Sequence, residues 1–125
     1  MSPPLRFSQL SPQRQALIRL CQAINYGSIE YLAVKDSEPV FEPWPVTVRD
    51  LKLDKDEDHR PEFDLADFVV RGEVARLLKR LDEMSSGTLR CIEVHAGLPR
   101  RVLVESPVTG ARRFGSVKPG GPNDL

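Results

Sequence analysis

The sequence predicts an α+β fold in which two helix–hairpin units share one antiparallel sheet, with both helices on one face. Two observations predict it. A helix pattern, a glycine, a short apolar strand, a turn and a proline occupy residues 17–39, and the same order recurs sixty residues later at 77–99. Repeat arrays generally need three or more units, so two copies favour one closed, pseudo-symmetric domain.

The repeat is supported by the structural role of each matching position. The identical pairs lie on a helix face, at a helix end, in a strand core and after a turn; they are Leu17/Leu77, Gly27/Gly87, Val34/Val94 and Pro39/Pro99. Independent occurrence of the same common unit is the alternative. Either origin predicts the same fold.

The first unit begins with a helix whose start is marked by Ser11 and Pro12, a capping residue and a proline suited to the first helical position. Leu17, Leu20, Cys21 and Ile24 follow at helical spacing on one apolar face. Gly27 is suited to the left-handed residue that ends a helix. Residues 28–34 are rich in β-forming side chains and predict a strand, which a turn at 35–38 and a short strand at 40–41 complete.

Between the units, residues 46–53 alternate apolar and polar side chains, which predicts an extra strand. Residues 54–62 are dense in charge and predict a solvated linker. The second helix is predicted over 65–84, with Asp64 as its cap and Asp67 near the positive end of the helix dipole. A strand at 88–95, a turn at 96–98 and a return strand at 101–105 follow.

The predicted core lies between the helices and the strands. It comprises Leu17, Leu20, Cys21, Ile24, Leu77, Leu78, Leu81 and Met84 against Leu32, Val34, Ile92 and Val94. Ile29 and Leu89 have the opposite strand parity, so they either precede a bulge or point to the other face.

Length and composition predict a single domain over residues 1–105, made of two repeats at about 11–42 and 65–105 joined by the segment 43–64. Residues 106–125 are rich in Gly and Pro and predict a flexible basic tail. The 18 basic and 18 acidic residues balance, which argues against a dedicated nucleic-acid binder. The sequence lacks a long apolar run or a secretory h-region, and its two cysteines form no disulfide framework, so we expect a cytoplasmic protein without a membrane partner.

The stretch AlaIleAsnTyrGlySerIleGluTyrLeuAlaVal at 23–34, followed by an Asp turn, resembles the small bacterial proteins of the YezD type. Those proteins are single helix–hairpin units of about half this length, and the resemblance covers 16–42 well and 76–104 loosely. The turn here is Asp36-Ser37, whereas theirs is Asp-Gly. The resemblance implies the fold and a bacterial origin, and it transfers no catalytic residue.

No chemical signature stands out in the chain. His59 and His95 lack partners at metal-ligand spacing, so we expect no metal site and no cofactor. Cys91 and His95 would lie about 13 Å apart along one strand, too far for a nucleophile and its base. We therefore expect a protein that is not an enzyme, although a catalytic site dispersed across loops is a further alternative.

The basic C-terminal part is the one suggestive feature. Arg100 and Arg101 lie in the second hairpin, and the candidate contact residues that follow them are Arg112, Arg113, Phe114 and Lys118. We expect an accessory or regulatory protein that binds a protein partner, or another copy of itself, through exposed sheet edges. The alternative is a nucleic-acid-binding module that uses the second hairpin and the tail, with basic groups on phosphates and Phe114 stacked on a base.

Overall fold

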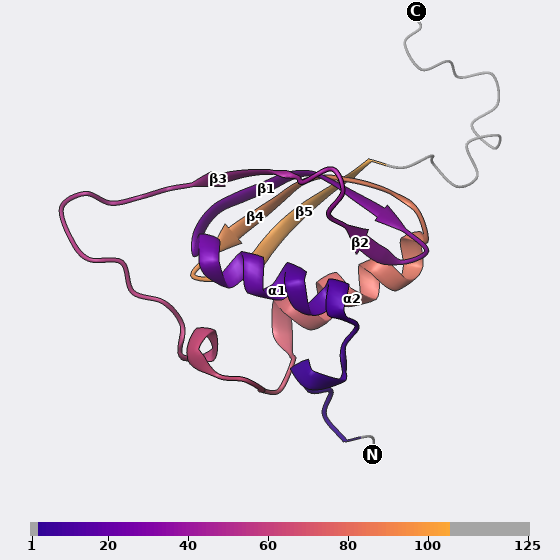
Figure 1. Cartoon of the computed structure of the whole chain (residues 1–125), viewed down its shortest axis with the longest axis horizontal. Coiled ribbons are helices and arrows are strands. Elements are labelled where there is room, and N and C mark those ends of the chain that lie inside the picture. Colours follow the sequence, from indigo (N-terminus) through magenta and orange to yellow (C-terminus); the bar gives the residue numbers. More distant parts are fainter. Residues whose placement is uncertain (1–2, 106–125) are drawn as a thin grey trace, which may run out of the picture.

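A five-stranded antiparallel sheet forms one layer of this protein, and two α-helices cover one face of that sheet (Figure 1). The computed structural model describes residues 3–105. The architecture confirms the predicted α+β class. The predicted tail, 106–125, lies outside the described residues. Within 3–105, every helix is too short or too polar to cross a membrane.

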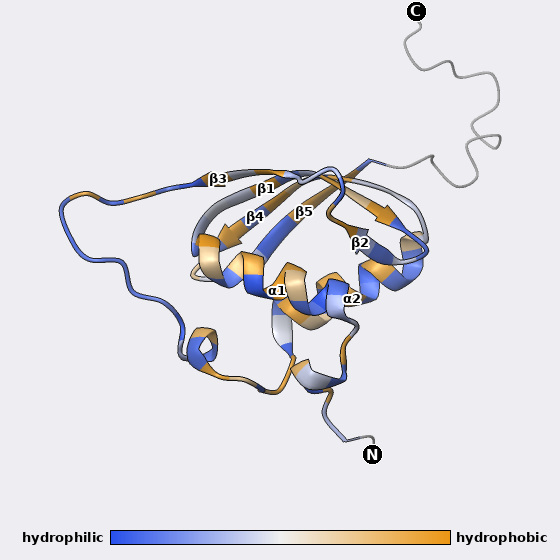
Figure 2. Ribbon diagram, in the orientation of Figure 1, coloured by the Kyte–Doolittle hydropathy of each residue, from blue (hydrophilic) through white to orange (hydrophobic). Residues whose placement is uncertain are grey.

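The elements follow one another in the order that the repeat predicts. They are α1 (Pro12–Ile24), β1 (Tyr26–Lys35), β2 (Glu38–Val40), β3 (Val46–Arg49), α2 (Gly72–Met84), β4 (Gly87–His95) and β5 (Leu98–Glu105). Short 3-10 helices at Phe7–Gln9 and Pro61–Asp64 lie in the segments that precede α1 and α2. The long connection between β3 and α2 is largely hydrophilic (Figure 2), as its charge density predicts.

Strands β1 and β4 form the centre of the sheet, whose order is β2-β1-β4-β5. On the side of β1 away from β4, residues 33–35 pair with β2 and residues 27–30 pair with β3. One edge of the sheet is therefore divided between two short strands. Among residues 3–105, the other edge is formed by β5 alone.

Helix α1 begins as predicted, and the residue with positive φ at its end is not the predicted one. The Ser11 side chain accepts a hydrogen bond from the Arg14 backbone N–H at 3.2 Å, which caps the first turn. At the other end, the left-handed residue is Asn25, with φ of 67°, and the assignment of that role to Gly27 is wrong. The Asn25 ψ of −63° gives the strained geometry of a γ-turn, and the Asn25 side chain is held by a hydrogen bond from its Nδ2 to the carbonyl of Asp58 at 2.6 Å.

Gly27 lies inside β1, where its lack of a side chain has a different purpose. A Cβ atom at this position would lie 1.9 Å from the carbonyl oxygen of Val48 in β3. Its φ of 154° also disfavours other residues. The glycine therefore permits the close approach of β3 to β1.

The core lies between the helices and the sheet, as predicted. Its buried members are Phe7, Leu17, Ile18, Cys21, Ile24, Ile29, Leu32, Val34, Val70, Val74, Leu77, Leu78, Leu81, Leu89, Ile92 and Val94. Leu20 and Met84 are only partly buried. Ile29 and Leu89 point inward despite their parity. In β1 this follows from Tyr31, whose left-handed φ of 59° shifts the alternation by one residue.

Helix α2 is shorter than the predicted helix at 65–84, because it begins at Gly72. The preceding residues are extended, and Val69 forms an isolated bridge with Arg6. Asp67 does not lie at the start of α2: it accepts hydrogen bonds from Arg6 Nε at 2.7 Å and from the N–H of Ser8, in the first 3-10 helix, at 2.8 Å. Asp64 ends a 3-10 helix and does not cap α2.

The predicted strand at 46–53 also ends early, at Arg49. The N–H of Asp50 donates to the carbonyl of Tyr26 at 2.7 Å, and the chain then leaves the sheet. Leu51 and Leu53 are exposed. The alternation of apolar and polar residues at 50–53 therefore does not correspond to a strand with one buried face.

The sixty-residue offset of the sequence recurs in the elements. Helices α1 and α2 both have 13 residues, and their ends are followed by left-handed residues, Asn25 and Ser85. The β1–β4 register pairs Gly27 with Val94 and Gly87 with Val34. The glycine of each unit thus pairs with the corresponding valine of the other unit across the two central strands.

Candidate functional site

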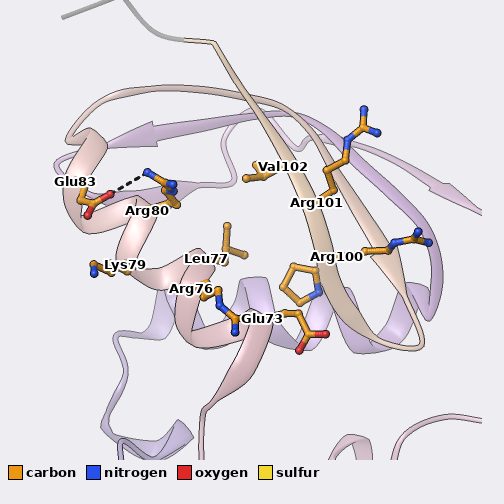
Figure 3. A pocket seen from close by; sticks show the side chains of 10 residues that line it. Glu73, Arg76, Leu77, Lys79, Arg80, Glu83, Arg100, Arg101 and Val102 are labelled. Carbon is orange, nitrogen blue, oxygen red and sulfur yellow. Dashed lines mark hydrogen bonds and ion pairs between the residues drawn. The ribbon is translucent and has the colours of Figure 1, made fainter.

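Helix α2 and strand β5 form the walls of a groove of about 470 Å³ (Figure 3). We call it the basic groove, and its lining residues are Glu73, Arg76, Leu77, Lys79, Arg80, Glu83, Pro99, Arg100, Arg101 and Val102. Leu77 and Pro99 are buried, and Val102 is half-buried against the core. These three give the groove an apolar floor.

Five of the lining residues are basic and two are acidic. Arg80 pairs with Glu83 at 3.2 Å, and Arg101 pairs with Glu93 at 3.6 Å. Arg76, Lys79 and Arg100 are exposed and make no ion pair within residues 3–105. The groove therefore carries positive charge that its own acidic residues do not neutralise.

The charges are spread along the groove and do not converge on one point. Figure 3 shows Lys79 and Arg80 toward one end, Arg76 lower on α2, and Arg100 and Arg101 on β5. A compact anion would be held best by several donors directed at one position. This spread suits an extended ligand with several negative charges.

Two of the predicted contact residues, Arg100 and Arg101, lie in this groove. The other four, Arg112, Arg113, Phe114 and Lys118, lie outside the described residues. The sequence reasoning missed Arg76, Lys79 and Arg80 on α2. Their spacing of i, i+3, i+4 places them on one helix face and was the signal that could have found them.

The corresponding place in the first unit has different chemistry. Sixty residues before Arg80 and Arg101 stand Leu20 and Phe41, and both pack against the core. The counterpart of Lys79 is Arg19, whose guanidinium lies 4.4 Å from the centre of the Phe7 ring and donates to the carbonyl of Glu62 at 3.0 Å. The basic groove is thus a property of the second unit.

The two cysteines are in settings that do not activate them. Burial raises the pKa of the Cys21 thiol to about 12, and burial together with Glu30 and Glu93 raises that of Cys91. Nucleophilic cysteines need the opposite shift. His59 stacks on Phe63, and His95 contacts the edge of Tyr26.

Residues 3–105 contain no cluster of three His, Cys, Asp or Glu side chains placed to hold a metal ion. The basic groove combines an apolar floor with three cations that have no ion-pair partner among these residues. Its residues can provide electrostatic attraction and apolar contact, which are the elements of a binding surface.

No family model, curated protein or solved structure matches this chain. The resemblance to the YezD-type proteins stays a prediction.

Proposed function

We propose that this chain is a non-enzymatic bacterial accessory or regulatory protein, located in the cytoplasm, that binds an acidic segment of a protein partner in the basic groove. One observation carries the proposal: Arg76, Lys79 and Arg100 have no ion-pair partner among the described residues and surround an apolar floor. Unpaired cations around apolar side chains favour a ligand that supplies both carboxylates and apolar groups.

We further propose that the two units are pseudo-symmetric copies and that function arose where they diverged. The exchanged register of β1 and β4 and the equal length of the helices support the relation. In the first unit, Leu20 and Phe41 contribute to the core. In the second, Arg80 and Arg101 line an open groove, so one copy supports the fold and the other presents the binding surface.

A protein partner fits this groove better than a nucleic acid. The net charge of the chain is zero, whereas nucleic-acid-binding domains are usually strongly basic. An apolar floor contributes nothing to a backbone phosphate and favours a side chain.

Nucleic-acid binding is the second candidate because the basic residues extend beyond the groove. Residues 100–118 carry five basic side chains and one acid, Glu105. A basic groove continuous with such a segment would bind phosphates through counterion release. The two candidates differ in whether nuclease removes the ligand.

A capture experiment with charge-reversed variants tests the proposal. The groove variant combines Arg76→Glu, Lys79→Glu and Arg100→Glu. The matched control combines Lys35→Glu, Lys52→Glu and Lys55→Glu, which make the same charge change at exposed positions outside the groove. Circular dichroism checks that both variants remain folded.

We expect a defined protein to be retained from bacterial lysate by the wild type and the control after nuclease treatment, and to be lost by the groove variant. Direct binding of that purified protein then establishes the contact. Loss on nuclease treatment alone would support the second candidate. Equal retention by the wild type and the groove variant would show that the groove is not the site.

A further inference from the structure

We infer that the ligand of the basic groove binds as an extended strand that adds to the edge of β5, and that its sequence alternates acidic and apolar residues; this inference rests on the function proposed above. Strand β5 ends the sheet order β2-β1-β4-β5. It pairs with β4 and, within residues 3–105, with no other strand. Its outer edge therefore presents backbone groups that a further strand can pair with.

The groove lies where a sixth strand would lie. An added strand would run about 4.8 Å from β5, in the plane of the sheet. The groove has β5 as one wall and α2 as the other, so a strand in this position would also contact the helix (Figure 3). Backbone pairing would give affinity, and side-chain contacts would select the sequence.

The required sequence follows from the two faces of such a strand. Side chains on its inner face would meet Leu77 and Val102, which are buried and half-buried, so these side chains should be apolar. Arg101 lies on the outer face, because it is in register with Glu93, which stands between two buried residues of β4. Side chains on the outer face of the added strand, near Arg101 and the adjacent exposed Arg100, should therefore be acidic. Because successive side chains of a strand point to opposite faces, the matching pattern is alternation.

Charge also disfavours a second copy of this chain as the occupant. An antiparallel pair of β5 edges centred on residues 100–101 would bring the Arg100 and Arg101 side chains of both copies close together. Like charges opposed across a strand pair are destabilising, and basic residues on an edge commonly prevent such pairing. An acidic strand reverses this effect and gains from the same residues.

A synthetic probe tests strand addition without knowledge of the natural partner. The probe is a labelled, acetylated peptide of alternating Glu and Val, about six residues long. Two further versions of the peptide carry backbone N-methyl groups on alternate residues. One version is methylated at the Glu residues, and the other is methylated at the Val residues. The N–H groups of only one set face β5, because alternate residues of a strand point their N–H groups to opposite sides.

We expect salt-sensitive binding of the parent peptide to the full chain by fluorescence anisotropy. One N-methylated version should bind about tenfold or more weakly, and the other should bind like the parent. Binding should also slow amide exchange in β5. The Arg100→Glu substitution should weaken binding of the Glu/Val peptide and strengthen binding of a Lys/Val peptide. The Lys52→Glu substitution should change the binding of neither peptide.

The outcomes separate this inference from the proposal beneath it. Equal effects of the two N-methylated versions would overturn strand addition and leave groove binding intact. Binding of a single-stranded oligonucleotide in place of the peptide would overturn both in favour of nucleic acid. If the peptide fails to bind at millimolar concentration, strand addition is wrong, and the capture experiment still decides the function.

Discussion

The backbone N–H of Gly97 donates a hydrogen bond to the carbonyl oxygen of Asn25 at 2.8 Å, which joins the turn of the second hairpin to the end of the first helix. The reciprocal contact also exists, since the N–H of Ser37 donates to the carbonyl of Ser85 at 2.6 Å. Each hairpin turn thus satisfies a carbonyl at the end of the other unit's helix. The two units are locked together at both ends of the central strand pair.

Replacement of Asn25 should be costly because this buried residue has two roles. It holds a left-handed φ, and its Nδ2 donates to the carbonyl of Asp58 at 2.6 Å. We expect Asn25→Ala to lower the free energy of unfolding by about 2 kcal/mol, from backbone strain and the lost hydrogen bond. Asn25→Gly, which keeps the backbone freedom, should cost less in urea denaturation; equal losses would show that the left-handed conformation does not matter.

Gly27 should tolerate no side chain. In Gly27→Ala, the new Cβ would overlap the carbonyl oxygen of Val48, so β3 must move away from β1. We expect a loss of about 2 kcal/mol in unfolding free energy and faster amide exchange in β3. Gly72→Ala is the control, because a Cβ there meets no atom within 4 Å and only the left-handed φ opposes it. A smaller effect at Gly27 than at Gly72 would contradict the close approach.

The ionisation of Asp67 should make the stability of the fold depend on pH in the acidic range. Its hydrogen bonds from the Arg6 side chain and the Ser8 N–H lower its pKa to about 2, from an ordinary value of 3.8. A carboxylate with a lowered pKa stabilises the fold fully above about pH 4, and this contribution disappears as the pH falls toward 2. Asp67→Asn should therefore be less stable than the wild type at neutral pH, and the difference should shrink between pH 4 and 2 in thermal melts. A constant difference over this range would argue against the shifted pKa.

The two cysteines should differ in reactivity. Cys21 is buried with its pKa raised to about 12, whereas Cys91 is only half-buried. At pH 8 we expect a thiol-specific disulfide reagent to modify one thiol per native chain slowly, and the second only after unfolding. Cys91→Ser should remove the native reaction. Native labelling that persists in this variant would show that Cys21 is accessible.

The elements with strong local patterns could be predicted from the sequence. Ser11 and Pro12 mark the start of α1 by capping chemistry, and the apolar spacing of Leu77, Leu78 and Leu81 identifies the buried face of α2. These signals are local, so no tertiary information was needed. The recurrence of the unit then indicated how the elements assemble.

The errors concern residues whose conformation depends on distant contacts. The extended segment before α2 is set by contacts of Asp67 and Val69 with residues near the N-terminus. The assignment of Asp64 as the cap and of Asp67 to the first turn extended the predicted helix through this segment. The basic groove could be predicted only in part. The sequence indicated Arg100 as a contact residue, whereas Arg76 lies in the same groove only because α2 and β5 lie side by side in the fold.

The division of one sheet border between β2 and β3 has a consequence for assembly. That border is broken into pieces of three and four residues, whereas β5 is a single strand of eight residues whose register with β4 shifts at Arg100. Short, interrupted edges recruit further strands poorly. For the strand addition proposed above, residues 3–105 therefore offer β5 as their one long edge. Complexes formed in this way should have one-to-one stoichiometry and should not propagate into filaments.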